Sequence, residues 1–189
     1  MAETRRLDHR DFGPLYDEHA RVLILGSFPS VKSREAKFYY GHPQNRFWRI
    51  LRALDDPAIM EEAMAGRPVD IGDLTVEDKT ALAKRLGFAL WDTIESCLIT
   101  GSSDASIRDV CVNDMSVILD AAPVRKIACN GAASYDLFVK HALPELKAYC
   151  ETRQIPEPEI IKLPSSSPAN AAWSLKRLVE AWKEALAIS

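Results

Sequence analysis

Basic and aromatic side chains are concentrated in residues 21–52, where they could hold phosphates and stack on bases. This stretch contains seven Lys or Arg residues and one acid, Glu35. Three consecutive aromatic residues, Phe38, Tyr39 and Tyr40, lie between the basic positions, and His42 follows them. Cationic groups interleaved with aromatic rings are typical of proteins that bind nucleic acid. A cationic loop after the first strand of an ordinary α/β protein would give the same pattern, so both interpretations stay open at this point.

The rest of the chain is acidic. Residues 55–95 hold ten acids and four bases, and the net charge of the whole chain is −3. A negative total argues against a general nucleic-acid coat protein. The asymmetry is compatible with one face that meets phosphates and another that faces solvent. A pair of solvated acidic helices explains the acidic half equally well.

Four apolar runs predict the strands that would position these side chains, over residues 21–26, 88–94, 125–130 and 159–163. Helical spacing and capping signals predict helices over residues 45–54, 58–65, 75–86, 132–143 and 174–187. A further helix is expected to start with Asn113 as its cap and to end before Pro123. Residues 1–20 are polar and are expected to be loop-like, anchored by Phe12, Leu15 and Tyr16.

Strands that alternate with helices predict a parallel sheet with helices on both faces. The loops 26–48, 92–96 and 164–171 each follow a predicted strand. Because the carboxyl ends of parallel strands meet at one edge of the sheet, these loops should converge there. Open α/β sheets bind their ligands at that edge.

Length and composition predict one globular domain over residues 1–189, with 47% apolar and 27% charged residues. No apolar run approaches the ~20 residues that span a bilayer, and the first residues lack the apolar core of a signal peptide. We therefore expect a cytoplasmic protein with no membrane partner. The four cysteines are 14, 18 and 21 residues apart, which is not the spacing of a zinc site or an iron–sulfur cluster. We expect no metal and no other cofactor.

Three motifs at these positions give the chain a specific resemblance: LILGSFPS at 23–30, YYGHPQNRFW at 39–48 and LPSSSPANA at 163–171. With ALWDTI, NDM and IACNG between them, the chain resembles the uracil-DNA glycosylase superfamily, and most of all its hypoxanthine-DNA (deoxyinosine) glycosylase branch. The resemblance implies a three-layer α/β/α sandwich on a short central parallel sheet. It also implies monofunctional hydrolysis of an N-glycosidic bond in DNA that contains a deaminated base, without metal or cofactor. We expect a monomer.

The resemblance carries functional roles to individual residues. Phe28 stands where other branches place a water-activating Asn or Asp, so Phe28 is interpreted as a wall of the base pocket. The water-positioning role passes to Asn45, for which a helix N-cap is the compatible alternative. Asp92 stands where uracil-specific relatives read the base with an Asn, and Leu163 where other branches have a His. Both departures argue against a strict uracil enzyme.

The predicted base-binding residues are Gly26, Ser27, Phe28, Tyr40 and Asp92. The predicted DNA contacts are Lys32, Arg34, Lys37, Arg46, Ser165, Ser166, Ser167 and Asn170. The functional hypothesis is a DNA glycosylase that removes hypoxanthine first, then uracil or xanthine. One alternative is a mismatch-specific uracil/thymine glycosylase. The other is a nucleic-acid-binding module of the same fold that has no catalytic activity.

Overall fold

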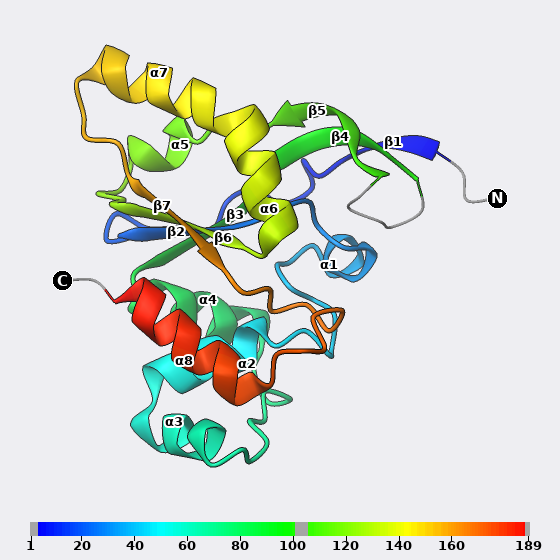
Figure 1. Ribbon diagram of the computed structural model, residues 1–189, viewed down its shortest axis with the longest axis vertical. Coiled ribbons are helices and arrows are strands. Elements are labelled where there is room, and N and C mark those ends of the chain that lie inside the picture. The colour runs from blue at the N-terminus through cyan, green and yellow to red at the C-terminus, as the bar shows by residue number, and fades with distance from the viewer. Residues whose placement is uncertain (1–3, 101–105, 188–189) are drawn as a thin grey trace.

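A parallel sheet lies at the centre of the computed structural model, which describes residues 4–100 and 106–187 (Figure 1). Within these residues the strand order of the sheet is β3-β2-β6-β7, and all neighbouring pairs are parallel. The strands are β2 (Val22–Gly26), β3 (Phe88–Asp92), β6 (Lys126–Asn130) and β7 (Glu159–Leu163). Every residue of β2 and β3 is buried, as expected of apolar runs in a sheet that is covered on both faces. The four predicted strands are confirmed, the second of them ending two residues earlier than expected.

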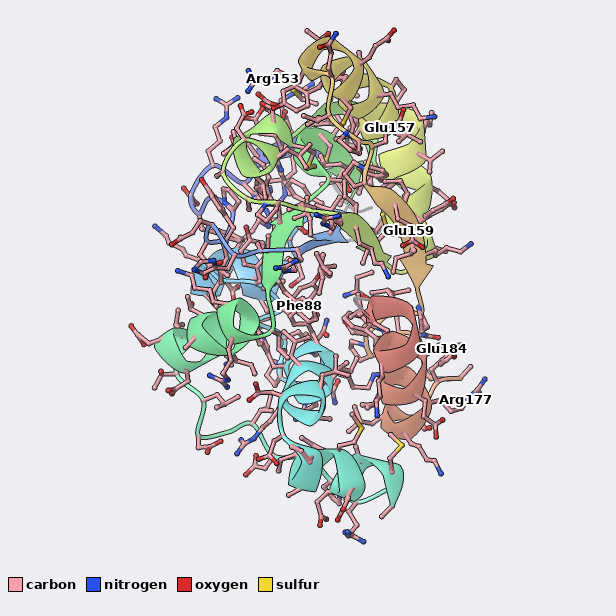
Figure 2. All side chains as sticks on the ribbon, turned by 90° about the vertical axis from the view of Figure 1, so that its left-hand side faces the viewer. Phe88, Arg153, Glu157, Glu159, Arg177 and Glu184 are labelled. Atoms are coloured by element: carbon pink, nitrogen blue, oxygen red, sulfur yellow. The ribbon has the colours of Figure 1, made fainter. Side chains whose placement is uncertain are left out.

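Helices cover both faces of this sheet. On one face lie α6 (Ala132–Leu137), the π-helical turn η2 (Phe138–Ala142) and α7 (Leu143–Arg153), with the short α5 (Ser116–Leu119) beside them. On the other face lie α2 (Phe47–Asp55), α4 (Val76–Arg85) and α8 (Leu175–Leu186), and α3 (Pro57–Met64) packs against α2 and α8. The expected three-layer α/β/α arrangement is confirmed. Figure 2 shows the charged side chains of Arg153, Glu157, Arg177 and Glu184 at the outside of these layers.

Local signals explain where the helices begin. Thr75 accepts a hydrogen bond from the Asp78 amide while the Asp78 side chain accepts one from the Thr75 amide, which completes the predicted capping box of α4. Ser174 caps α8, whose apolar stripe buries Leu178, Val179, Trp182 and Leu186. The Trp182 indole N–H donates to the Pro164 carbonyl at 2.9 Å. Helix α8 therefore anchors the start of the 164–171 loop. None of the described helices is both long and apolar enough to cross a membrane.

A second, antiparallel sheet was not predicted. Its strand order is β1-β4-β5, formed by β1 (Thr4–Asp8), β4 (Ile94–Thr100) and β5 (Arg108–Val112). The expectation that residues 1–20 are loop-like is therefore wrong for Thr4–Asp8. The sequence of this strand, TRRLD, has one apolar residue. Its strand conformation depends on pairing with β4 rather than on a hydrophobic pattern.

Asn113 does not cap a helix. The nearest helix, α5, begins at Ser116, and the Ser116 amide donates to the Asp114 side chain instead. The Asn113 amide group donates to the Asp92 backbone carbonyl at 2.9 Å. Asn113 therefore stabilises the junction at which the chain leaves β3 for β4.

His9 is buried behind this junction. The sequence indicated no role for this residue. Its side chain is 1% exposed, and its Nε2 lies 3.9 Å from Asp92 Oδ2 and 3.3 Å from the Asn113 amide nitrogen. Burial lowers the pKa of His9 from 6.5 to about 4, against the opposing effect of Glu95 and Asp8. The imidazole is therefore neutral at neutral pH.

We expect His9 to make the fold less stable in mild acid. Between pH 6.5 and about 4 the unfolded chain binds a proton at His9 and the folded chain does not. Stability therefore falls as the pH falls through this window, by up to about 3 kcal/mol, and is independent of His9 above it. Denaturant unfolding at pH 7.5 and 5 should show a smaller loss for His9→Gln than for the wild type. Replacing the exposed His19 is the control, and an equal loss in wild type and His9→Gln would contradict the prediction.

Candidate active site

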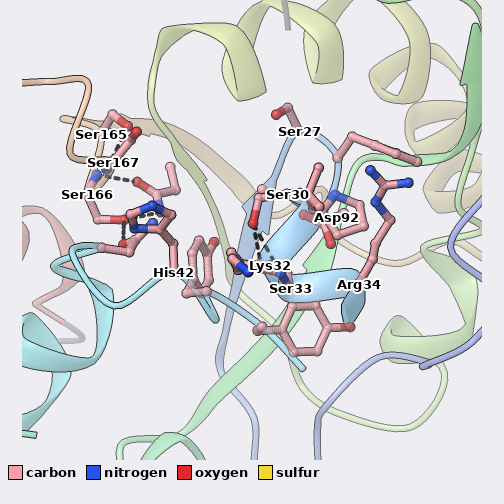
Figure 3. Close-up of a pocket in the computed structure, with 18 of the residues that line it drawn as sticks. Ser27, Ser30, Lys32, Ser33, Arg34, His42, Asp92, Ser165, Ser166 and Ser167 are labelled. Carbon is pink, nitrogen blue, oxygen red and sulfur yellow. Dashed lines mark hydrogen bonds between the residues drawn. The ribbon is translucent and has the colours of Figure 1, made fainter. Parts of the chain in front are cut away.

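One pocket of about 620 Å³ opens at the carboxyl edge of the central sheet (Figure 3). It is formed by the segment after β2 and helix α1 (Val31–Ala36), the 39–45 segment, the ends of β3 and β6, and the loop after β7. Residues 26–45, the ends of β3 and β6 and the loop after β7 are far apart in sequence and meet because the parallel strands all end at this edge. The lining residues that the sequence predicted are Gly26, Ser27, Phe28, Lys32, Arg34, Tyr40, Asn45, Asp92, Ser165, Ser166 and Ser167.

A chain of hydrogen bonds fixes the Asn45 side chain at one wall of the pocket. Asn45 Oδ1 accepts from the Phe47 amide at 3.0 Å and from the Ser166 hydroxyl at 2.9 Å. The Ser166 hydroxyl in turn accepts from Asn130 Nδ2 at 2.8 Å. Two donors occupy the two lone pairs of the Asn45 carbonyl oxygen, so the amide N–H groups are its remaining polar groups. Asn45 is thus oriented as a donor, and it also supports the start of α2.

Asn130 is a site residue that the sequence analysis missed. It ends β6 and holds Ser166 twice, because its Oδ1 also accepts from the Ser166 amide at 2.9 Å. The next residue, Gly131, has a φ of 101°, and a Cβ there would lie 2.9 Å from the Ser165 Cβ. Glycine is therefore required for the 164–171 loop to lie against the end of β6. The sequence signal that could have identified Asn130 is a polar residue followed by a glycine at the carboxyl end of a strand.

Arg46 organises the 164–171 loop from inside, and its predicted role as a DNA contact stays a prediction. Its guanidinium donates to the backbone carbonyls of Ser166, Ser167, Asn170 and Trp173, with distances of 3.3 Å to Ser166 and 3.0 Å to Asn170. Four of its five N–H donors are thus used within the protein. The role follows from geometry, because a planar guanidinium can join several carbonyls of one loop.

We expect Arg46→Ala to lower the free energy of unfolding by about 2–3 kcal/mol, because partly buried carbonyls would lose a charged donor. Base release should fall as well, since the loop carries Ser166. Arg46→Lys should rescue only part of both losses, because one ammonium cannot reach four carbonyls. Denaturant unfolding and single-turnover kinetics measure the two effects. Arg153→Ala, an exposed pair with Asp120, is the control, and an Arg46→Ala variant that behaves like it would contradict the prediction.

The serines of the loop differ in their exposure. Ser166 is completely buried, and its hydroxyl donates to Asn45; its predicted contact with DNA stays a prediction. Ser165 and Ser167 are half-buried and line the pocket. Asn170 donates its amide group to the Ser165 carbonyl at 2.9 Å and is not among the lining residues.

Asp92 forms the floor of the pocket together with Gly26. The Asp92 residue is 5% exposed, and a Cβ on Gly26 would lie 2.2 Å from Asp92 Oδ1. Glycine at position 26 therefore leaves the space in which the carboxylate lies. Tyr40 adopts a left-handed φ of 54° and stacks on Phe47, with ring centroids 3.7 Å apart. Burial, and next the neighbouring Asp92, raise the pKa of the Tyr40 hydroxyl, which stays protonated.

Phe28 and Arg34 form the opposite wall. The Phe28 ring is in edge contact with His9 and packs against Ile94, Cys97 and Ile99 of β4. The Arg34 guanidinium carbon lies 5.8 Å from the centre of that ring. Lys32 pairs with Glu35 at 2.8 Å, and the exposed Lys37 ends α1 without lining the pocket.

Comparison with known proteins agrees with this architecture. Residues 14–186 match the model of the uracil DNA glycosylase superfamily. The chain is similar to a hypoxanthine DNA glycosylase of Methanosarcina barkeri (strain Fusaro / DSM 804), with 33% identity over 92% of this chain and 95% of the relative. It is 32% identical to one of Methanosarcina acetivorans, over 89% and 92%.

A solved structure gives the same result. The solution NMR structure of a Methanosarcina acetivorans protein, provisionally named a uracil DNA glycosylase, has a TM-score of 0.63 and 31% identity, over 93% of both chains. The superfamily match covers most of the chain, and the two curated relatives exceed 30% identity over nearly their full length. The chain therefore belongs to the uracil DNA glycosylase superfamily.

Proposed function

We propose that this DNA glycosylase, a hydrolase of N-glycosyl bonds, releases hypoxanthine from DNA and uses Asn45 to position the attacking water. The relatives named hypoxanthine DNA glycosylases support the substrate. Within the molecule, the supporting observation is the buried side chain of Asp92, which lines the same pocket as Asn45. A base extruded into this pocket would be recognised along its edge by Asp92, and its glycosidic bond would be hydrolysed beside Asn45.

Asp92 suits the chemical change that deamination makes. Adenine has an acceptor at ring nitrogen N1, whereas hypoxanthine has an N–H donor there. Cytosine and uracil differ in the same way at N3. A fixed carboxylate accepts from the deaminated ring and repels the lone pair of the undamaged one. Asp92 is therefore the proposed reader of the base edge, and the same reasoning extends to uracil as a secondary substrate. Guanine and xanthine both have an N–H at N1, so this contact would accept xanthine without distinguishing it from guanine.

Asn45 suits the hydrolytic step. As the C1′–N bond loosens, C1′ becomes strongly electrophilic, so the water needs orientation more than deprotonation. An amide N–H fixed by the contacts of its own carbonyl oxygen can hold the water oxygen beside C1′. The departing base takes the bonding electron pair and is stabilised by hydrogen bonds from the pocket. The water donates its proton to solvent or to the base, which leaves an abasic site.

A panel of labelled duplexes tests the proposal, each carrying one hypoxanthine, uracil, xanthine or G·T mismatch and each treated with alkali after single-turnover incubation. We expect the fastest strand cleavage for hypoxanthine. Faster cleavage at uracil or at the mismatch would replace the proposed substrate and leave the reaction class intact. Binding without alkali-labile sites on any duplex would identify a non-catalytic binding module and overturn the proposal.

A further inference from the structure

Arg34 is a half-buried cation at the pocket wall that lacks an ion-pair partner among residues 4–100 and 106–187. Its neighbour Glu35 pairs with Lys32, and the Arg34 Nε is buried without a hydrogen-bond partner in the same described residues. Burial, and next the proximity of Arg5, lower the pKa of Arg34. A second positive charge therefore lies near the first, which is unfavourable unless an anion joins them.

Arg5, the residue near Arg34, belongs to strand β1 of the second sheet. In the antiparallel pair of β1 and β4, Arg5 lies directly opposite Ile99, and residues opposite one another project from the same face of a sheet. Ile99 lines the pocket. Leu7, two positions along β1, packs with the cluster that contains Phe28 and Ile99, as the alternation of a strand requires. The exposed Arg5 side chain is thus on the face that turns toward Arg34.

Arg6 provides an internal comparison. It is the next residue of the same strand and projects from the opposite face, where it pairs with Asp109 and donates to the Ser96 hydroxyl. Two adjacent arginines of β1 therefore differ in their surroundings. Arg6 has an acid of its own, whereas none of the ion pairs of the described residues includes Arg5.

We propose that Arg5 and Arg34 together bind one DNA phosphate at the rim of the pocket, adjacent to the extruded nucleotide. This inference rests on the proposed function. Guanidinium groups hold phosphate oxygens through paired, charge-assisted hydrogen bonds. Arg5 is exposed, so the pair faces the outside of the pocket, where the sugar–phosphate backbone must pass while the base lies between Asp92 and Asn45. In Figure 3, Arg34 lies on the opposite side of the pocket from Ser165 and Ser167, as groups that hold an extruded strand on both sides would.

With this role for Arg5, the second sheet would contribute to DNA binding. It brings an N-terminal strand to the base pocket of the central sheet and adds a cation that the motifs around residues 26–34 do not contain. The proposed site takes a backbone phosphate, so it should contribute to binding without distinguishing one base from another.

Binding of a duplex with a non-hydrolysable 2′-fluorinated deoxyinosine tests the proposal for Arg5→Ala, Arg34→Gln, the double variant and Arg6→Ala. We expect each of the first two to weaken binding about 5- to 30-fold at ~0.1 M salt, and the double variant, which loses the phosphate contact, to reduce the slope of log K against log salt by about 0.9. Because both arginines hold the same phosphate, the double variant should lose clearly less than the product of the two single losses. Arg6→Ala should stay within about twofold of the wild type.

Single neutral methylphosphonates in the damaged strand locate the contact. One position beside the lesion should weaken wild-type binding, and the double variant should be insensitive to that same substitution. Wild-type affinity and salt slope in the double variant, or an equal loss in Arg6→Ala, would overturn the proposal. Arg5→Ala alone decides the matter if Arg34→Gln unfolds, because Arg5 is exposed. These experiments measure binding and not base release. A failure of the proposed function would appear on the substrate panel and is therefore distinguishable from a failure of the phosphate site.

Discussion

Asn45→Ala should lower the single-turnover rate of base release by about 10²–10³, equivalent to roughly 3–4 kcal/mol in the barrier. The Asn45 amide is oriented before substrate binds, because its oxygen accepts from the Phe47 amide at 3.0 Å and from the Ser166 hydroxyl at 2.9 Å. A water held by this fixed amide would gain most in the transition state, where its position relative to C1′ matters. DNA affinity should change little.

The same substitution also removes the contact with the Phe47 amide, for which we expect a loss of about 1 kcal/mol in stability. Gln44→Ala, at the exposed neighbouring position, controls for general effects on this segment. Ser166→Ala keeps the amide but removes one of the two donors that orient it, so its rate should fall between wild type and Asn45→Ala. If Asn45→Ala loses 1 kcal/mol of stability and retains the full rate on every base, Asn45 is a structural residue only.

Gly26→Ala should reduce base release by about 10², because a displacement of roughly 1 Å in a reacting site has an effect of that size. The new Cβ would lie 2.2 Å from Asp92 Oδ1, so the buried carboxylate must leave its place on the pocket floor. Single-turnover kinetics on the hypoxanthine duplex measures the loss, and thermal unfolding shows whether the fold persists.

Two comparisons make this result specific. Gly13→Ala is the matched control, because a Cβ at Gly13 meets nothing within 4 Å. In an Asp92→Ala background, Gly26→Ala should cost little further activity, since the group that it displaces is already absent. A full additional loss in that background would show that Gly26 acts through something other than Asp92.

The sequence by itself determined the central sheet and the edge at which the pocket lies. The strands over residues 22–26 and 88–92 are continuous apolar runs, and a sheet covered on both faces buries each of their residues. Local chemistry likewise fixed the start of α4, because a capping box requires only four consecutive residues. The loops that follow the strands had to meet at one edge because the strands are parallel.

Tertiary structure alone decided what the polar side chains of those loops contact. Arg46 and Ser166 are 120 positions apart, and only the packing of the 164–171 loop on α2 and β6 makes a guanidinium bind its carbonyls and buries the serine hydroxyl against Asn45. The strand Thr4–Asp8 depends in the same way on β4, since its own residues show no apolar alternation. Apolar burial repeats along a chain and can be read from it, whereas a hydrogen-bond partner is set by whichever distant group the finished fold brings within about 3 Å.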